Sequence, residues 1–359
     1  MKKILLPCLG LMAAANLSGC GGTRENDPAS LTQASLDLAI EQVVDNTIIP
    51  AANRFLVSSQ GLNASLDSFC AAPDASGLAD VQASWKTLAT DWYGVLPFNF
   101  GPLNDDVVFP AYLFVDSYRL RGTDYTETVR SEIDSLLAAD TALTTEYFDG
   151  KTFQYVGLLA LEVALFETAA SQNADVNAVV AEFVATPRKC ELATGLAGLM
   201  EAKAQYIVDG WQTSYLEGAD SYRTLFLAGE IDDGSTPLVV LITAFQEYLD
   251  YLNQRATVSN VARLSGNAWS QMAMSVDALD AMLGGSDSAT VSLLGLMDNS
   301  GNTTNADTVR ANIAAIRNAI ADEDAVTFNS MAATLDGNLK REVPDSLDVS
   351  LGINFTDGD

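Results

Sequence analysis

Apolar residues recur every three or four positions along most of the chain, which is the spacing that places side chains on one face of an α-helix. Three such stripes are Trp85, Leu88, Trp92 and Val95; Ile242, Phe245, Leu249 and Leu252; and Val309, Ile313, Ile316 and Ile320. Each stripe suits a helix that buries one side in a bundle. Alternating patterns are scarce, and the one candidate strand spans residues 347–355. The sequence therefore predicts an all-α protein.

We expect two packed helical bundles, divided in the polar stretch between Ser171 and Arg188. The N-terminal bundle is predicted over residues 31–175, with a nearly all-apolar helix at 152–168, and the C-terminal bundle over residues 185–359. Pro50 interrupts the first helical pattern, so two helices or one kinked helix are expected there. Residues 96–122, 284–286 and 298–305 are predicted to be loops. No strict repeat is visible, although two similar bundles are compatible with an ancient duplication.

The N-terminus has the features of an export signal. Lys2 and Lys3 precede a short apolar stretch, and Leu-Ser-Gly-Cys follows at positions 17–20. This tetrapeptide resembles the lipobox of bacterial lipoproteins, in which cleavage precedes a cysteine that is then acylated. We therefore expect a signal peptide at 1–19, lipidation of Cys20, a tether at 20–30 and attachment to a membrane through acyl chains. Gly21 favours the outer membrane, facing the periplasm. A plain secretory signal with an unrelated cysteine is the alternative.

The predicted export of the chain determines which cysteines are left to form a disulfide. Cys8 would leave with the signal peptide and Cys20 would be acylated, so one pair remains in an oxidising compartment. We predict a disulfide between Cys70 and Cys190.

Composition narrows the possible chemistry. The formal net charge is −28, which disfavours nucleic acid as a partner because phosphate contacts require a basic face. The chain contains no histidine, and this excludes Ser-His-Asp triads, histidine-based zinc sites and imidazole ligation of haem. No zinc or haem is expected. Any metal would need oxygen ligands, which favours calcium, magnesium or iron(III).

Glu162 stands out within the apolar helix at 152–168. Its neighbours three and four positions away are all apolar, so no partner comes from its own helix. A buried carboxylate must find a donor or a cation, coordinate a metal, or stay protonated with a raised pKa. These situations are frequent at functional sites, but structural ion pairs produce the same pattern. Gly157 in the same segment indicates a helix start or the close approach of another backbone.

The segment Gly-Leu-Leu-Ala-Leu-Glu at 157–162 resembles the signature of the imelysin family, the peptidase M75-like proteins of bacterial envelopes. Further resemblances follow in order along the chain from about residue 36 to the C-terminus. They include Val-Asp-Asn-Thr-Ile-Ile-Pro at 44–50, Pro-Phe-Asn-Phe-Gly-Pro at 97–102, Arg-Lys-Cys at 188–190 and Phe-Thr-Asp-Gly-Asp at 355–359. The resemblance implies two helical bundles, a cleft near the signature helix, and a link to iron regulation or uptake.

The sequence departs from the family pattern Gly-x-His-x-x-Glu because Leu159 occupies the histidine position. Only Gly157 and Glu162 carry over, and leucine cannot bind a metal. Asp116 and Arg119 lie where the family tends to have an aspartate and an arginine, and an Arg119–Glu162 ion pair is one hypothesis for the buried acid. If a metal is bound, Glu162 is the candidate ligand.

The leading hypothesis is a non-catalytic envelope lipoprotein that binds a ligand around Glu162 between the bundles. The ligand is iron, another hard cation or an iron-uptake partner protein. A metallopeptidase that works through carboxylates alone, or a structural or assembly lipoprotein, are the alternatives.

Overall fold

The computed structural model describes residues 31–106, 108–119, 122–231, 234–286 and 289–351. The predicted signal peptide, Cys20 and the tether lie outside this range. Of the described helices, none combines the length and apolarity that a bilayer crossing requires. The described residues form helices and no strand, apart from an isolated bridge between Thr168 and Ser171. The candidate strand at 347–355 is not formed as far as Leu351, and the rest of it lies outside the described residues.

Among the described residues, the first half of the chain forms nine α-helices with short helical turns between them. They are α1 (Gln33–Val43), α2 (Ile49–Ala71), α3 (Ala75–Val95), α4 (Ala111–Val115), α5 (Thr126–Ala138), α6 (Thr145–Asp149), α7 (Gly157–Phe166), α8 (Val176–Ala185) and α9 (Arg188–Gln212). The turns are η1 (Val44–Ile48), η2 (Gly101–Leu103), η3 (Ser117–Arg119) and η4 (Phe153–Tyr155).

The described part of the second half adds eight α-helices. They are α10 (Tyr222–Ala228), α11 (Pro237–Gln254), α12 (Thr257–Asn260), α13 (Ala268–Gly284), α14 (Leu293–Asn299), α15 (Thr303–Ala321), α16 (Ala325–Lys340) and α17 (Glu342–Ser346). The loop predicted at 298–305 is shorter than expected, because α14 runs to Asn299 and α15 begins at Thr303.

The prolines mark helix starts. Pro50 lies in the first turn of α2, and the helix continues from α1 through η1, a π-helical segment, so the interruption is absorbed without a break. Pro237 opens α11 in the same way, where its missing N–H would have no helical partner.

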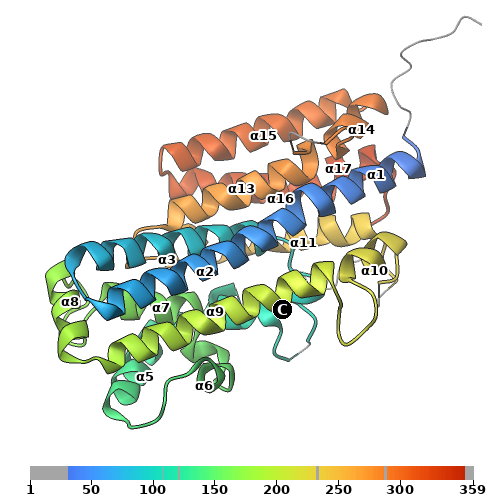
Figure 1. The fold of residues 1–359 in the computed structure, drawn as a ribbon. Helices are drawn as coiled ribbons and strands as arrows, with labels where there is room; N and C mark the ends of the chain where they lie inside the picture. The colour runs from blue at the N-terminus through green and yellow to red at the C-terminus, as the bar shows by residue number, and fades with distance from the viewer. Residues whose placement is uncertain (1–30, 107, 120–121, 232–233, 287–288, 352–359) are drawn as a thin grey trace, which may run out of the picture.

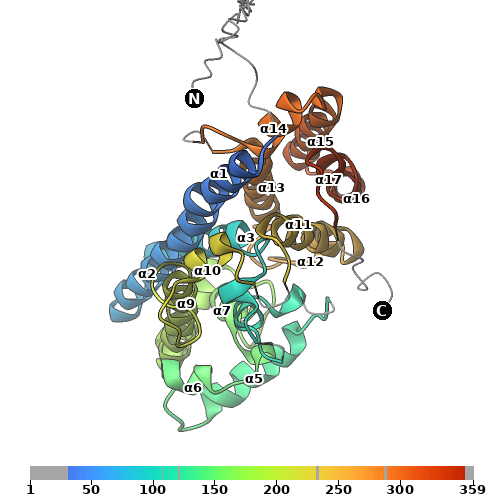
Figure 2. The same cartoon turned by 90° about the vertical axis from the view of Figure 1, so that its right-hand side faces the viewer.

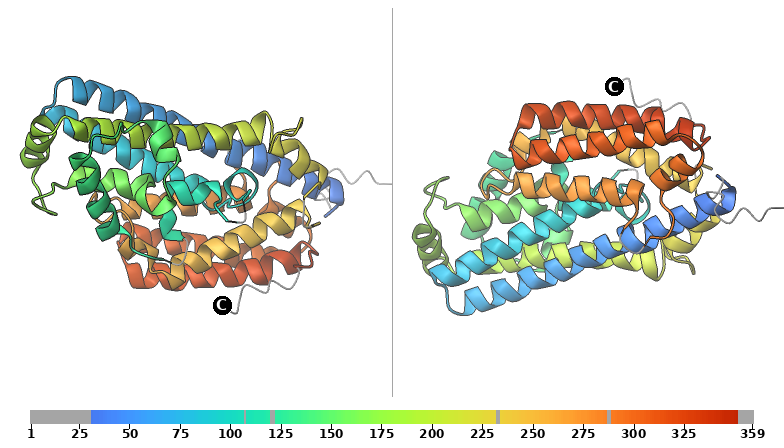
Figure 3. Two further views of the ribbon diagram at one scale, coloured as in Figure 1. Left: turned by 90° about the horizontal axis from the view of Figure 1, so that it is seen from below. Right: turned by 90° about the horizontal axis from the view of Figure 1, so that it is seen from above.

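The helices pack as two bundles that lie side by side (Figures 1 and 2). In the first, α2 packs along α3 and α9, and α7 packs against α9, α5 and α3. In the second, α16 packs against α11 and α15, while α13 packs on α15. The bundles meet where α13 lies along α3, and the views from below and above show both groups running in roughly the same direction (Figure 3). One continuous apolar core includes residues of both bundles.

Helix α9 packs across the predicted boundary between the two units. Helix α9 follows the polar stretch at 171–188, yet it lies against α2, α6 and α7 and completes the first bundle. The division into units at 31–175 and 185–359 stays a prediction, and α9 packs mainly against helices of the first group. The disulfide between Cys70 and Cys190, with Cα atoms 5.9 Å apart, joins the end of α2 to the start of α9. The suggested duplication stays a prediction.

Candidate functional site

Helix α7 is the centre of the candidate site. Eight of its ten residues are buried, as the all-apolar sequence predicts. Gly157 opens the helix with φ +87°, and a Cβ on this residue would lie 2.6 Å from the carbonyl oxygen of Val115. Only glycine accepts both this backbone conformation and this close approach. Gly157 therefore lets α7 start directly against the end of α4, which places the following turn of α7 beside residues 115–118.

Glu162 lies one turn further along α7 and is 3% exposed. Its Oε1 accepts hydrogen bonds from the backbone N–H groups of Leu264, at 3.1 Å, and Ser265, at 2.8 Å. These residues belong to the loop at 261–267, between α12 and α13. Burial raises the pKa of the Glu162 carboxyl group, and the two backbone hydrogen bonds oppose that rise without cancelling it. Glu162 therefore joins the first bundle to a loop of the second.

The same loop is attached to the first bundle at a second point. Asn267, its last residue, donates through Nδ2 to the carbonyl oxygen of Lys86 and to Oγ1 of Thr90, both at 3.0 Å. Both acceptors lie on α3. Two sets of hydrogen bonds therefore hold the loop at 261–267, one to Glu162 on α7 and one from Asn267 to α3. They fix the backbone of the loop at the junction of the bundles.

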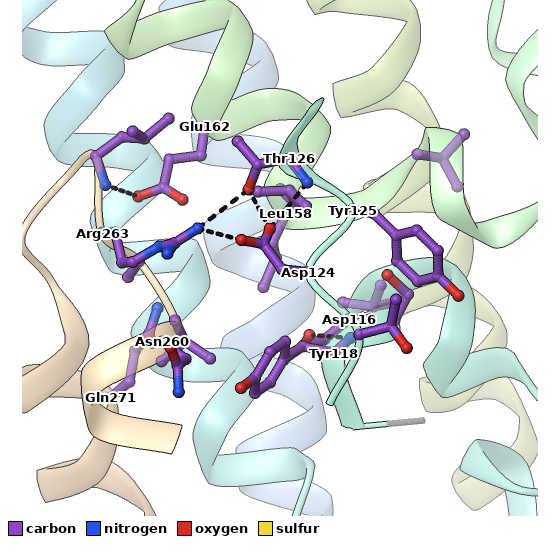
Figure 4. Close-up of a pocket in the computed structure, with 18 of the residues that line it drawn as sticks. Asp116, Tyr118, Asp124, Tyr125, Thr126, Leu158, Glu162, Asn260, Arg263 and Gln271 are labelled. Atoms are coloured by element: carbon purple, nitrogen blue, oxygen red, sulfur yellow. Dashed lines mark hydrogen bonds and ion pairs between the residues drawn. The ribbon is translucent and has the colours of Figure 1, made fainter. Parts of the chain in front are cut away.

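A cavity of about 440 Å³ lies against Glu162, between the two bundles. The first bundle contributes α3, α7, α5 and residues 115–118 and 123–127, and the second contributes residues 260–264 and the first turns of α13 (Figure 4). The lining residues are Trp85, Tyr93, Val115, Asp116, Ser117, Tyr118, Thr123, Asp124, Tyr125, Thr126, Glu127, Arg130, Val156, Leu158, Leu159, Glu162, Gln172, Asn260, Val261, Ala262, Arg263, Leu264 and Gln271. The volume is within the range typical of small-molecule sites.

The two described guanidinium groups of the lining are paired with carboxylates. Arg263 contacts Asp124 at 2.5 Å, across the mouth between the bundles (Figure 4). Burial opposes ionisation of Asp124, but hydrogen bonds from Thr126 and the Arg263 ion pair lower its pKa overall. Arg130 binds both oxygens of the buried Glu167, at 2.5 and 2.7 Å, and also contacts a carboxylate oxygen of Glu127.

The opposite side of the cavity holds buried polar groups. The hydroxyl of Tyr93 donates to Oδ2 of Asp116 at 3.1 Å, and the backbone N–H of Tyr118 donates to Oδ1 at the same distance. Gln271 on α13 is 2% exposed, and its Oε1 has no hydrogen-bond partner among the described residues. This oxygen has almost no accessible surface, so it is shielded from the cavity, and a buried acceptor without a partner destabilises the fold.

The structure brings several of the predicted residues to this one place. Asp116, Leu159 and Glu162 line the cavity, and Gly157 positions the helix that carries two of them. Arg119 lies in η3, but its side chain is outside the described part, so an Arg119–Glu162 ion pair stays a prediction.

Asp124, Arg263 and Gln271 are among the lining residues that were not found from the sequence. Asp124 and Arg263 lie in segments without periodicity, where no pattern marks them. Gln271 could have been recognised from the sequence, because it is a polar residue beside Met272 on the buried face of a helix.

A catalytic metal ion would need suitable ligand atoms among the side chains around the cavity. A zinc peptidase site requires nitrogen or sulfur ligands in addition to carboxylates, and the chain contains no histidine. Within the described ranges, no group of three or more Asp, Glu or Cys side chains is placed to hold an ion. The described residues around the cavity therefore do not fit a catalytic zinc ion.

Comparisons with known proteins agree with this architecture. The model of the imelysin family matches residues 48–347, which is most of the chain. The protein belongs to the imelysin family. None of the functionally curated proteins matches this imelysin-family chain.

Two solved structures share the imelysin-type fold. An imelysin-like protein from Psychrobacter arcticum 273-4 superposes with a TM-score of 0.71 at 17% identity, over 90% of this chain and 99% of that one. A putative iron-regulated protein A precursor from Parabacteroides distasonis ATCC 8503 superposes with a TM-score of 0.58 at 17% identity, over 89% of this chain and 96% of that one. At this identity the likeness establishes the fold alone.

Proposed function

We propose that this protein is a non-catalytic binding protein of the cell envelope, and that its ligand occupies the cavity beside Glu162. The observation that carries the proposal is the bond from the family glutamate to the loop at 261–267, directly against a cavity of about 440 Å³. The glutamate fixes one wall of a site that contains residues of both bundles. We therefore expect the site to bind a ligand without changing it chemically.

The geometry supports binding over peptide hydrolysis. Oε1 of Glu162 already accepts two backbone N–H groups, so this oxygen holds the loop and is not offered to a water molecule. Leu159 replaces the family histidine and forms part of the cavity wall. An apolar wall at this position favours contact with the body of a ligand.

The cellular setting is part of the proposal. The first 20 residues support export and acylation of Cys20, which would attach the protein to the outer membrane facing the periplasm. One protein with this fold is described as a putative iron-regulated protein A precursor, which supports a role in iron uptake or homeostasis. Metabolic labelling with a radioactive fatty acid tests the anchor: the wild type should incorporate label and Cys20→Ser should not. Label retained in Cys20→Ser would contradict lipidation at this position.

A thermal-shift screen of small polar compounds, iron salts and calcium tests the binding site. A compound that binds in the cavity should raise the melting temperature of the wild type. Leu159→Trp places a large ring in the cavity and should abolish that shift. Val326→Trp is the matched control, because Val326 is 81% exposed on α16 and does not line the cavity. A shift that persists in Leu159→Trp would place the ligand elsewhere and contradict the proposal.

The peptidase alternative is tested with unfolded protein substrates. We expect no cleavage by the wild type beyond that seen with Glu162→Ala. Cleavage by the wild type that is lost in Glu162→Ala, while Glu230→Ala on an exposed loop keeps it, would overturn the binding proposal.

A further inference from the structure

The lining of the cavity beside Glu162 divides into a buried floor and an exposed rim. The floor includes Trp85, Leu158 and Glu162, each at most 6% exposed. The exposed lining residues form the rim, and they are Thr123, Asp124, Glu127, Gln172, Asn260 and Arg263. A molecule that comes from solvent must therefore pass the rim to reach the floor.

One ion pair closes across this rim. Nη2 of Arg263, on the loop at 261–267, donates to Oδ2 of Asp124 in the first bundle at 2.5 Å (Figure 4). Among the rim residues, as far as the structure describes them, this is the ion pair whose two partners belong to different bundles. Glu127, by comparison, pairs with Arg130 on its own helix. The contact between Arg263 and Asp124 therefore bridges the opening between the bundles.

The two partners of this ion pair are held differently. Asp124 is fixed, because its Oδ1 accepts hydrogen bonds from the backbone N–H of Thr126 at 2.9 Å and from the Thr126 hydroxyl at 2.5 Å. The backbone beside Arg263 is also fixed, since the N–H of Leu264 donates to Glu162. The Arg263 side chain, however, is 47% exposed. The guanidinium group can therefore rotate away from Asp124 while both backbones stay in place.

The strength of the contact suits repeated opening. An exposed ion pair contributes little free energy, and salt screens it, so thermal motion breaks it easily. The base of the same loop is held by the buried Glu162 and by Asn267. Opening at the rim therefore does not require the two bundles to separate.

We propose that Arg263 and Asp124 form a gate over the cavity, which opens when the Arg263 side chain swings away from the carboxylate and closes when it returns. This inference goes beyond the proposed function, because it concerns access to the cavity and holds for any ligand. The gate controls how fast a molecule enters and leaves.

A thiol on the floor measures access directly, without a known ligand. Leu158→Cys places it there, and N-ethylmaleimide, a neutral reagent, modifies it when the gate is open. The full chain is kept under non-reducing conditions, and mass spectrometry of the peptide that contains position 158 separates this thiol from other cysteines. Adding Asp124→Asn should speed the modification about two- to fivefold, the range that a surface ion pair provides. Asparagine keeps an oxygen that Thr126 can donate to.

Arg263→Gln breaks the same ion pair from the other side and separates gating from a direct effect of charge on the thiol. Removal of a nearby carboxylate lowers the pKa of a thiol and speeds its reaction, whereas removal of a nearby guanidinium group raises that pKa and slows it. A gate instead predicts faster modification in both variants. Faster modification with Asp124→Asn and slower modification with Arg263→Gln would overturn the proposal.

Salt gives a second readout, because it weakens an exposed ion pair. Modification of Leu158→Cys should become faster as sodium chloride is raised, and Asp124→Asn should remove this dependence. Arg310→Gln is the matched control, since it breaks an exposed ion pair with Asp298 that does not line the cavity. Val326→Cys, at an 81% exposed position, reports the reactivity of the reagent itself. A rate at position 158 that neither variant nor salt changes would show that no gate exists.

Folding and the binding function are checked separately. Asp124→Asn and Arg263→Gln should melt within a few degrees of the wild type, because the pair is exposed. If Leu158→Cys does not fold, Leu159→Cys on the same wall carries the thiol. If a compound binds in the thermal screen but the rates ignore the ion pair, the gate is wrong and the binding function stands. If the rates follow the ion pair and no compound binds, the gate stands and the binding function fails.

Discussion

Replacing Glu162 tests the connection between the two bundles. In Glu162→Leu, the volume of the side chain is nearly kept, but the N–H groups of Leu264 and Ser265 lose their acceptor. In Glu162→Gln, the amide oxygen still accepts both hydrogen bonds, while the charge is removed. The two variants therefore separate the hydrogen bonds from the charge.

The expected magnitude follows from the geometry. A hydrogen bond to a charged acceptor contributes about 1.5 to 3 kcal/mol, and a buried donor left without a partner costs about 1 to 3 kcal/mol. Two bonds are lost at once, at 3.1 and 2.8 Å, but the buried carboxylate itself carries a desolvation penalty that leucine does not. We expect Glu162→Leu to lower the free energy of unfolding by about 2 to 4 kcal/mol, and Glu162→Gln to change it by less than about 1 kcal/mol.

Urea unfolding gives the free energies, and hydrogen exchange read by mass spectrometry locates the effect. Exchange in the loop at 261–267 should accelerate in Glu162→Leu and stay slow in Glu162→Gln. Glu230→Leu is the control, because Glu230 is exposed, is not part of the loop and does not line the cavity. If Glu162→Leu unfolds within about 0.5 kcal/mol of the wild type, or if exchange in the loop is unchanged, the glutamate does not hold the loop.

Comparison of the wild type with Glu162→Gln also tests how the stability depends on pH. Burial raises the pKa of Glu162 above its ordinary value of 4.5, so the folded state holds this proton more tightly than the unfolded chain does. The stabilising contribution of the group is complete below 4.5 and is lost as the pH rises through the raised pKa. The stability of the wild type relative to Glu162→Gln should therefore fall as the pH rises from 4.5 through the raised pKa. A relative stability that increases with pH would reverse the sign and contradict the assignment.

The remaining predictions concern the disulfide and the start of α7. Cys70 and Cys190 are separated by 120 positions, so the double replacement by serine should lower the free energy of unfolding by up to about 5 kcal/mol, and reductant should affect the wild type but not the variant. Equal melting temperatures of the two proteins under oxidising conditions would show that the crosslink has no stabilising effect. Gly157→Ala should destabilise by at least about 1 to 3 kcal/mol, because its Cβ would clash with the carbonyl oxygen of Val115 at a positive φ. Gly61→Ala, in the middle of α2 with open space around the added carbon, should instead stabilise by about 0.5 to 1 kcal/mol, and thermal unfolding of both variants checks the contrast.

Much of the fold could be predicted from the spacing of apolar residues. The stripe at Trp85 and Trp92 is buried on α3, and the all-apolar segment around Glu162 is the buried helix α7. The pairing of Cys70 with Cys190 followed from counting the cysteines that export and acylation would leave. These features depend on local periodicity or on composition, and both can be read along the chain.

The position of α9 could not be predicted in the same way. Its apolar stripe shows that one face is buried, but the stripe does not say which helix covers that face. The long, matching faces of α2 and α9 decide it in three dimensions, and the disulfide lies at one end of that contact. A division drawn at the polar stretch before α9 therefore separated two helices that pack together.

The candidate site shows the same limit. Sequence alone determined that Glu162 is an acid in an apolar helix, that Leu159 replaces the family histidine, and that any site here must work without imidazole. Only the tertiary structure decided that the partners of Glu162 are two backbone N–H groups about a hundred residues away, and that Gln271 faces the same cavity. Nearly every residue type has a backbone N–H group, so the pattern of side chains along the sequence cannot show which of these groups bind Glu162. They become visible when the folding of the second bundle brings its loop against α7.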